Sequence, residues 1–423
     1  MTGNLTLPRS LAEAVLTKRD LILRIVQRIA STRKQEELLE QGERELRELP
    51  IPQAGNPPGG VGSEDGGSST IDMEAYTVYM VKAWAGSWLL GGDRKYRNLA
   101  DHSAADVGVI IGFTRGSEAR VRFYRETLEA YTASRAVEAM GGGVFLWDGS
   151  LRPLLLWPWG KELKRKASNR AVEMAPRLLG GRGRSIDAVY EQVKDLYSRR
   201  PLLLALELAS RLVEEEEKLD GETWEWLAYL EWLEKLTALK DFLERAWERG
   251  VETVFVSKTT RSQFLFRKPL PDVFYLNLIT RGSETYKTFY TRPRIWRGAS
   301  QVANREHEPK ERFLTGDPGE LKAFYEGRLG VLELYARISP GKPILKVDIA
   351  FDLKQWNPKS AEEAEEKAVE VLEGLSLLSG ETGYPFPLLR AHRNARIGWE
   401  GKEAVIRALG LGLERRSRSM LEI

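Results

Sequence analysis

Six residues spread along this 423-residue chain have the types that a metal-assisted reaction requires. They are Asp65, Glu129, Asp148, Lys258, Tyr384 and His392. Two or three carboxylates with one histidine suit a hard or borderline divalent cation such as Mn²⁺ or Mg²⁺. Such a centre lowers the pKa of a bound water and clamps a phosphodiester during displacement, and a lysine can stabilise the extra negative charge. The set therefore points to phosphodiester hydrolysis, if the fold brings these residues together.

Asp148 stands in the segment Val144–Leu155, VFLWDGSLRPLL, where four apolar residues lead into an acidic residue and a glycine. This pattern predicts a buried strand that ends in a carboxylate at a tight turn. A rigid strand end would hold a metal ligand in a defined position. The alternative is an ordinary hairpin, because Asp-Gly is a common two-residue turn.

Asp65 lies within a segment rich in Gly, Pro and Ser, residues 54–70, which predicts a loop or linker. The next segment, Ala75–Ala85, has the Tyr, Val, Thr and Trp content of a strand. Gly66 and Gly67 would let the backbone turn sharply and approach a ligand. Asp72 is the alternative acidic residue at this place in the chain.

Glu129 lies in a stretch, Ser117–Met140, that we interpret as a charged strand passing into a helix. The helix would lead through three glycines into the Asp148 strand, so Glu129 would project toward the end of that strand. Glu126 is one turn away and shares the same face, which makes it the fallback ligand. Either residue could instead be an ordinary surface carboxylate of an amphipathic helix.

The remaining three candidates lie in the second half of the chain. Lys258 follows the β-branched run Val251–Val256 and is expected at a strand end. Tyr384 and His392 lie in Gly383–Ile397, GYPFPLLRAHRNARI, where two prolines predict that a helix begins only after Pro387. His392 is one of three histidines, and an isolated histidine is more often structural than a ligand.

Other segments complete the predicted organisation. We expect an N-terminal helix in residues 10–49, a helical region in residues 161–250, a helix in residues 361–377, and strands in residues 107–113, 273–278, 330–338 and 344–351. The Trp-rich helix around residues 224–236 is either intramolecular core or an oligomer interface. Five units are predicted: residues 1–52, 53–160, 161–250, 251–410 and a basic tail, 411–423.

Composition limits the classes of function. With 64 basic and 61 acidic residues the net charge is +3, so any polyanion site must be a local patch. The absence of cysteine excludes disulfides, thiolate catalysis and Cys-based zinc sites, and with the 30% charged residues it fits a thermophile weakly. No apolar run reaches about 18 residues and no signal peptide is evident, which predicts a cytoplasmic protein without membrane spans. A P-loop for ATP is also missing.

Several of these motifs together resemble the NurA nuclease family. The similar pieces, in family order, are DGGSS (Asp65–Ser69), YMVKAWA (Tyr79–Ala85), FLWDGSL (Phe145–Leu151), SKT (Ser257–Thr259) and GYPFPLLRAH (Gly383–His392). The resemblance extends over Gly62–Ile397, and WDGSL and the YP…AH segment are its most specific parts. It implies an α/β fold with an RNase H-like mixed sheet, flanking helices and a helical insertion.

The resemblance also implies an activity, partners and site residues. Family members are manganese-dependent nucleases of single- and double-stranded DNA, here expected to be 5′–3′ exonucleases with single-strand endonuclease activity. They act with the HerA-type hexameric translocase in DNA end resection and form ring-like homodimers. The family's acidic ligands fall on Asp65, Glu129 and Asp148, with His392 as a further site residue and Tyr384 beside it. The family's apolar strand before the first Asp-Gly is here the Gly-rich Gly59–Glu64.

Two other classes of function compete with the nuclease. An ATPase or phosphotransferase of the actin-like fold would also use a DGGSS-type phosphate turn, but a second such turn is not evident in the sequence. A non-catalytic DNA-binding or scaffold subunit would use the same carboxylates only as turn caps. ATP turnover would favour the first, and full activity of an Asp148 variant in the assembled complex would favour the second.

Overall fold

The structure is a computed structural model of the whole chain. It describes residues 18–21, 40–42, 44–50, 57–72, 76–93, 95–111, 116–180, 183–214, 223–267, 270–281, 283–303 and 317–410. Most of the predicted N-terminal helix and the basic tail around Arg415–Arg418 lie outside these residues. No helix in the described ranges has both the length and the apolar character that crossing a membrane requires.

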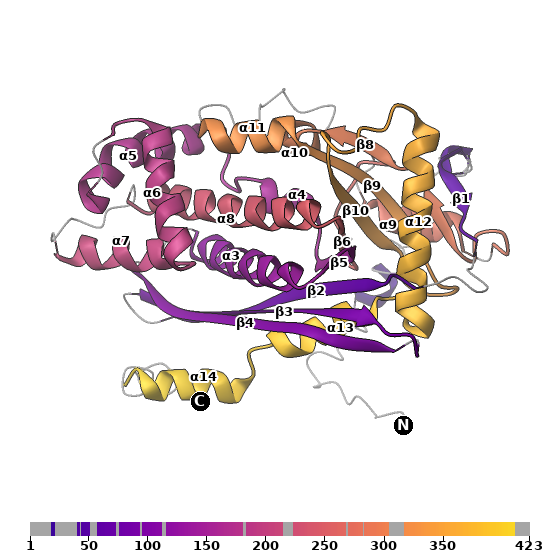
Figure 1. The fold of residues 1–423 in the computed structure, drawn as a ribbon, viewed down its shortest axis with the longest axis horizontal. Helices are drawn as coiled ribbons and strands as arrows, with labels where there is room; N and C mark the ends of the chain where they lie inside the picture. The colour runs from indigo at the N-terminus through magenta and orange to yellow at the C-terminus, as the bar shows by residue number, and fades with distance from the viewer. Residues whose placement is uncertain are drawn as a thin grey trace.

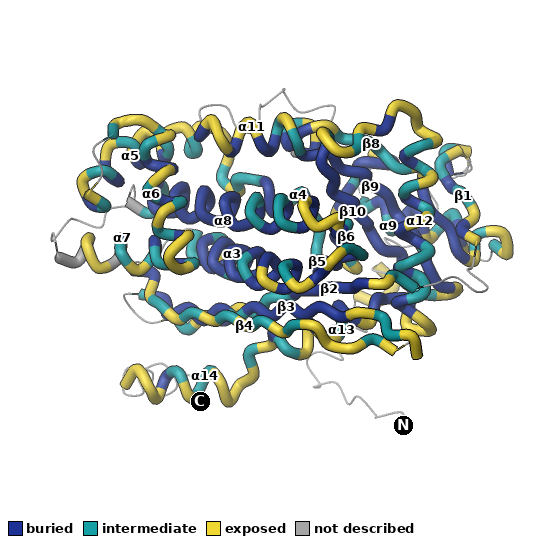
Figure 2. The backbone as a smooth tube through the Cα atoms, in the orientation of Figure 1, coloured by how far each residue is buried: buried dark blue, intermediate teal, exposed yellow. Residues whose placement is uncertain are grey.

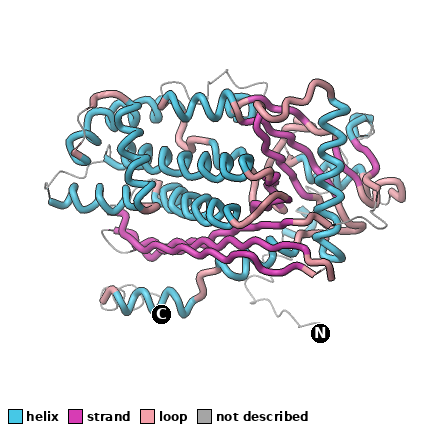
Figure 3. Tube along the Cα trace, in the orientation of Figure 1, coloured by secondary structure: helices cyan, strands magenta, loops and turns pink. Residues whose placement is uncertain are grey.

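A ten-stranded mixed sheet organises the molecule, with helices packed on both of its faces (Figures 1 and 3). Its order is β1-β7-β9-β10-β6-β5-β2-β3-β4, with β8 paired to β9. The strands are β1 Leu46–Glu48, β2 Gly60–Asp72, β3 Tyr76–Leu90, β4 Tyr96–Ile111, β5 Gly143–Asp148, β6 Val251–Ser257, β7 Phe289–Thr291, β8 Arg294–Arg297, β9 Leu329–Arg337 and β10 Leu345–Asp352. The central strand β5 is parallel to β2 and β6, whereas the other pairs are antiparallel.

The helices connect and cover these strands. They are α3 Ser117–Glu138, α4 Leu151–Leu155, α5 Lys161–Leu179, α6 Ile186–Arg199, α7 Leu203–Glu214, α8 Thr223–Glu248, α9 Asp272–Ile279, α10 Ala299–Ala303, α11 Gly319–Gly327, α12 Ala361–Ser379, a 3₁₀ turn Gly380–Thr382, α13 Phe386–Ala395 and α14 Trp399–Ala408. Helices α5 to α8 lie between β5 and β6 in the chain, where the helical region was predicted. The division into five units stays a prediction.

The two faces of β5 pack against different helices because strand side chains alternate. Phe145 and Trp147 belong to a core shared with α3 and α8. Val144 and Leu146 belong to a second core shared with α12 and α13. The central strands are buried on both faces (Figure 2), as the near-continuous apolar run of β5 predicts. Asp148 falls on the same face as Leu146 and therefore faces α13.

The Trp-rich helix α8 is intramolecular core. Trp226 and Trp232 are 1% and 0% exposed and pack with β5 and α3. These two side chains are therefore buried within the chain, and no second chain is needed to cover them.

The prediction that residues 54–70 form a loop was wrong over most of its length. Residues Gly60–Asp72 form strand β2, and Asp65 lies inside this strand rather than before one. Close neighbours leave no space for a larger residue in this strand: a Cβ at Gly62 would lie 2.3 Å from the Phe145 ring. Long-range pairing with β3 and β5 therefore overrides the local preference of glycine for turns.

Other local predictions also need correction. Residues Val273–Leu278 are helical within α9 instead of a strand, and Ser117 already begins a helix. Leu46–Glu48 is a strand paired with β7 instead of the end of a helix. The Asp148–Gly149 turn leads from β5 into α4, so it is no hairpin. Helix α13 begins at Phe386, because a proline in the first helical turn loses no hydrogen bond.

Candidate metal centre

Asp65 and Asp148 lie side by side on the α13 face of the sheet. The parallel register pairs Glu64 with Trp147, so the residues that follow are neighbours on adjacent strands. One oxygen of each aspartate and one ring nitrogen of His392 all lie within 4.8 Å of one another. Residues 65, 148 and 392 are far apart in the chain, so the tertiary fold has brought together two carboxylates and an imidazole.

His392 comes from α13, which packs directly on β2. Its Nδ1 lies 2.7 Å from Asp65 Oδ2, and its side chain is 64% exposed. Gly67 permits this close packing, since a Cβ there would lie 2.5 Å from the carbonyl oxygen of Ala395. The imidazole thus stands at the solvent side of the cluster, where a substrate has access.

Tyr384 and Lys258 complete the same side of the cluster. The Tyr384 hydroxyl donates a hydrogen bond of 2.8 Å to Asp148 Oδ1. Lys258 Nζ lies 3.7 Å from the centroid of the Tyr384 ring, which is a cation–π contact. Burial, followed by the negative charge of Asp148, raises the pKa of Tyr384, so its hydroxyl keeps the proton that it donates. The pair orients Asp148 and places a positive charge beside it.

Glu129 approaches from the opposite face of β2. Its carboxylate lies against the backbone of Gly66, where a Cβ would be 2.1 Å from Oε1. Arg125, one turn earlier on α3, places Nε 3.1 Å from the same oxygen. Within the described residues, the aspartate–histidine group does not include Glu129. Burial raises the pKa of Glu129 to about 8 despite the adjacent Arg125, and Glu126, Asp65 and Asp148 also raise it.

Glu64 is a further carboxylate at this place that the sequence argument did not select. It is fully buried, and its Oε1 accepts a hydrogen bond of 3.2 Å from the Asp148 N–H, while Oε2 has no hydrogen-bond partner among the residues that the structure describes. Burial, then the charges of Glu129, Asp65 and Asp148, raise its pKa well above its ordinary value. Had residues 60–72 been interpreted as a strand, alternation would have placed Glu64 on the face of Glu129.

The two alternative ligands lie elsewhere. Asp72 is at the far end of β2 and accepts a hydrogen bond of 2.9 Å from Thr77. Glu126 is buried between Arg122 and Lys235, with ion-pair distances of 3.6 Å and 3.4 Å. Neither belongs to the aspartate–histidine group.

The turn after Asp148 is held by a second buried set of charges that the sequence did not reveal. Asp348 Oδ2 accepts hydrogen bonds from Ser150 Oγ at 2.7 Å and from the Leu151 N–H at 2.9 Å. Lys346 pairs with Asp348 and with Glu333, the latter at 2.8 Å. These contacts tie the β5–α4 junction to β10 and so restrict the position of Asp148.

The electrostatics of the cluster favour a cation. Burial raises the pKa of Asp148, and the neighbouring charge of Asp65 raises it further. Carboxylates held this close repel one another, and a divalent cation between them would relieve the repulsion. Their oxygen donors and the imidazole nitrogen match the ligands that Mn²⁺ and Mg²⁺ accept.

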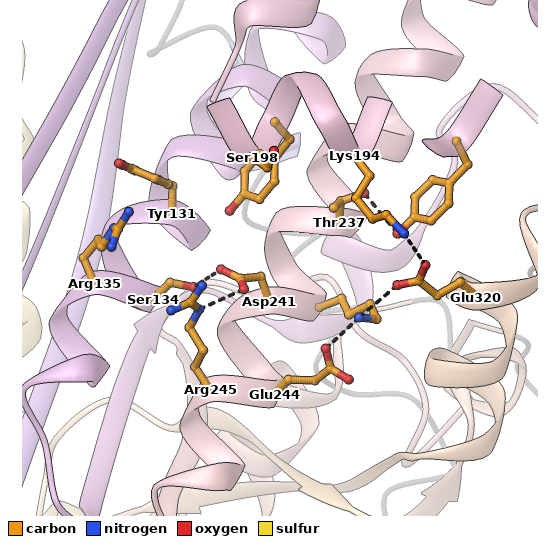
Figure 4. A pocket seen from close by; sticks show the side chains of 13 residues that line it. Tyr131, Ser134, Arg135, Lys194, Ser198, Thr237, Asp241, Glu244, Arg245 and Glu320 are labelled. Carbon is orange, nitrogen blue, oxygen red and sulfur yellow. Dashed lines mark hydrogen bonds and ion pairs between the residues drawn. The ribbon is translucent and has the colours of Figure 1, made fainter. Parts of the chain in front are cut away.

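A separate cavity of about 250 Å³ lies between α3, α6, α8 and α11 (Figure 4). Two of its cations are paired with acids of the same lining: Lys194 with Glu320, and Arg245 with Asp241, both at 2.8 Å. Arg135, which also lines it, pairs with Glu138 at 3.4 Å. None of the six candidate residues lines this cavity. Its paired charges do not indicate an anion site, and the candidate residues lie instead at the cluster on β2 and β5.

The sheet and the acidic cluster together define an α/β protein of the RNase H-like class. The chain belongs to the NurA family, because the family model described as the NurA domain matches residues 62–397. The curated "DNA double-strand break repair nuclease NurA" of Saccharolobus solfataricus is 24% identical over 357 residues, 83% of this chain and 80% of the relative.

Solved structures agree on the fold. The crystal structure of the NurA nuclease from Sulfolobus solfataricus matches with a TM-score of 0.59 at 18% identity, covering 97% of this chain and 98% of that one. A structure described as NurA bound to dAMP and manganese matches with a TM-score of 0.60 at 15% identity, covering 96% and 98%. The predicted family and the predicted fold class are therefore confirmed.

Proposed function

We propose that this chain is a metal-dependent deoxyribonuclease whose centre is formed by Asp65, Asp148 and His392. The observation that carries the proposal is the convergence of these three ligand atoms within 4.8 Å. Support comes from the curated family relative, named a DNA double-strand break repair nuclease, and from family structures described with manganese. The cofactor is expected to be Mn²⁺, with Mg²⁺ as the second choice.

The residues present fit such a cation. Two carboxylates and one imidazole would hold it, with Glu129 as the fourth predicted ligand on the other face of β2. The bound cation would supply Lewis-acid polarisation of the phosphate and a water of lowered pKa.

The chain's own residues have distinct tasks in this proposal. Tyr384 fixes one oxygen of Asp148, and Gly66 and Gly67 bring α3 and α13 close to the two faces of β2. Lys258, beside the Tyr384 ring, offers a positive charge to the phosphate oxygens as negative charge develops there. His392 is the most exposed of the three ligands and lies where a DNA strand would enter.

The finer assignment follows the family resemblance. We propose 5′–3′ exonuclease activity with single-strand endonuclease activity, in DNA end resection together with a HerA-type hexameric translocase, and a homodimeric assembly. The substrates would be single- and double-stranded DNA, and the compartment the cytoplasm. The family assignment argues against the competing actin-like ATPase. The experiment below distinguishes a nuclease from a non-catalytic DNA-binding subunit.

The test compares end-labelled single- and double-stranded oligonucleotides incubated with the purified chain and Mn²⁺, with and without a HerA-type translocase. We expect Asp148→Asn to lower the cleavage rate more than about 100-fold, because even outer-shell partners of a metal contribute about 10–100-fold. Asp72→Asn is the matched control, since Asp72 lies on the sheet but away from the cluster. Wild-type cleavage by a folded Asp148→Asn protein would refute the proposal.

A further inference from the structure

Four charged residues form one stripe along α3: Arg122, Arg125, Glu126 and Glu129. Their spacing of three and four residues places them on the same side of the helix. They form two ion pairs of the same type, Arg122 with Glu126 at 3.6 Å and Arg125 with Glu129 at 3.1 Å. Only the second pair lies next to the proposed metal centre, because Glu129 lies against Gly66, the residue that follows Asp65.

The guanidinium of Arg125 is used on one edge only. Its buried Nε lies at ion-pair distance from Glu129 and makes no hydrogen bond within the described residues, whereas the Arg125 side chain as a whole is 32% exposed and that of Glu129 is 6% exposed. Within the described part of the chain, neither terminal nitrogen of Arg125 has a hydrogen-bond acceptor, and neither is a buried orphan. The two terminal nitrogens of the planar guanidinium, with four N–H groups between them, are therefore available to a ligand from solvent.

The surroundings keep this group charged. Glu129 contributes most to raising the pKa of Arg125, and Glu126, Glu64 and Asp65 add to it. An acidic centre also repels the phosphates of DNA, so a cation beside it lowers the electrostatic cost of substrate approach. Arginine forks match the oxygens of a phosphate in a bidentate manner.

We propose that Arg125 binds a backbone phosphate of the DNA substrate through its two terminal nitrogens while its Nε orients Glu129. The inference rests on the proposed nuclease function and adds a substrate-binding residue to that site. Arg125 thereby links the phosphate to Glu129, the carboxylate of α3 that lies against Gly66. Arg122, which pairs with a glutamate outside the centre, has no such task.

The test compares four forms of the full chain: wild type, Arg125→Gln, Arg125→Lys and the matched control Arg122→Gln. Binding to a short oligonucleotide is measured in Ca²⁺ at several salt concentrations, and KM and kcat are measured in Mn²⁺. We expect Arg125→Gln to raise KM about tenfold, the size of one charge-assisted hydrogen bond. We expect kcat to change less than KM.

The salt dependence gives a readout that a structural role would not change. Loss of one phosphate contact should lower the slope of log affinity against log salt by about 0.7–0.9. Arg125→Lys should restore the slope, because lysine keeps the positive charge. It should restore only part of the affinity for DNA, because lysine lacks the planar guanidinium that can bind a phosphate with two nitrogens. Arg122→Gln should leave KM within about threefold of wild type, because Arg122 pairs with Glu126, which does not belong to the aspartate–histidine group.

Three outcomes would overturn the inference: wild-type KM and slope in folded Arg125→Gln, equal effects of Arg122→Gln and Arg125→Gln, or a fall in kcat and Mn²⁺ affinity with unchanged DNA affinity. The last would mean that Arg125 only positions Glu129. Failure of the nuclease proposal is distinguishable, because in that case the wild type itself would not cleave DNA, whereas DNA binding in Ca²⁺ would still report on Arg125.

Discussion

At the scale of residues, hydrogen bonds and an ion pair from neighbouring side chains hold the proposed ligands in place. Tyr384 holds Asp148, Glu64 holds the backbone N–H of Asp148, and Arg125 holds Glu129. Two glycines, Gly66 and Gly67, leave the space that Glu129 and α13 occupy. The proposed ligands are thus held by contacts on both faces of the sheet at β2 and β5.

Tyr384 offers a direct test at this scale. Tyr384→Phe removes the hydrogen bond to Asp148 and keeps the ring on which Lys258 stacks. We expect the Mn²⁺-dependent cleavage rate to fall about 10–100-fold, as for other groups that orient a metal ligand.

Tyr290→Phe is the control, since its hydroxyl donates to Glu365 and its strand β7 is separated from β5 by β9, β10 and β6 in the sheet. Its rate should stay near wild type. Equal rates for the two variants would show that orientation of Asp148 by Tyr384 does not matter.

At the scale of elements, the junction between β5 and α4 is tied to β10 by buried charge. Asp348 and Lys346 are 2% and 3% exposed, and Asp348 accepts two hydrogen bonds from the start of α4. Ser150 makes no side-chain hydrogen bond that caps α4. Asp348 instead accepts the hydrogen bond of the first backbone N–H of the helix, as a capping side chain would.

Asp348→Ala should lower the free energy of unfolding by about 3 kcal/mol. The reason is that it leaves Lys346 buried with only part of its compensation and leaves the Leu151 N–H without its acceptor. Urea unfolding followed by circular dichroism measures the change.

The comparison variant is Glu191→Ala, which breaks an exposed ion pair with Lys194 and should cost less than about 1 kcal/mol. If both substitutions had the same small effect, the junction would not depend on Asp348.

At the scale of the whole molecule, helices α3 and α8 carry charged groups into the core between sheet and helices. Glu234 of α8 is fully buried and accepts a hydrogen bond of 2.8 Å from the Leu202 N–H. Burial raises its pKa from the ordinary value of 4.5 to about 8, with only partial relief from that hydrogen bond. Leu202 itself has a φ of 64°, an uncommon conformation for a non-glycine residue.

This burial predicts how stability depends on pH. Between pH 4.5 and 8 the folded state holds a proton on Glu234 that the unfolded state has released, so the contribution of Glu234 to stability falls as pH rises through this window. Glu234→Gln cannot ionise and keeps an acceptor for Leu202. Its stability relative to wild type should therefore increase with pH, by at most about 1.4 kcal/mol per pH unit.

Urea unfolding at pH 5, 6.5 and 8 measures the difference between the two proteins, which cancels the titration of other groups. Glu173→Gln, at a glutamate that is 65% exposed, should follow wild type at every pH. A constant difference between Glu234→Gln and wild type would contradict the raised pKa.

The sequence by itself was sufficient for the features that depend on local pattern and on residue type. Apolar runs located β5, β6, β9 and β10, and acidic, histidine and tyrosine residues in recognisable motifs identified the family and its candidate residues. The absence of cysteine and of a P-loop excluded whole classes of chemistry. Such conclusions need no knowledge of which segments meet.

Only the tertiary structure decided which of these residues share a site. Glycine in Gly60–Asp72 favours turns locally, but pairing with two strands makes this segment extended, and its alternation separates Glu64 from Asp65. The same packing placed Asp72 and Glu126 outside the centre and gave Arg125 and Asp348 their positions. These assignments depend on contacts between residues distant in the chain, and local sequence preference carries no information about such contacts.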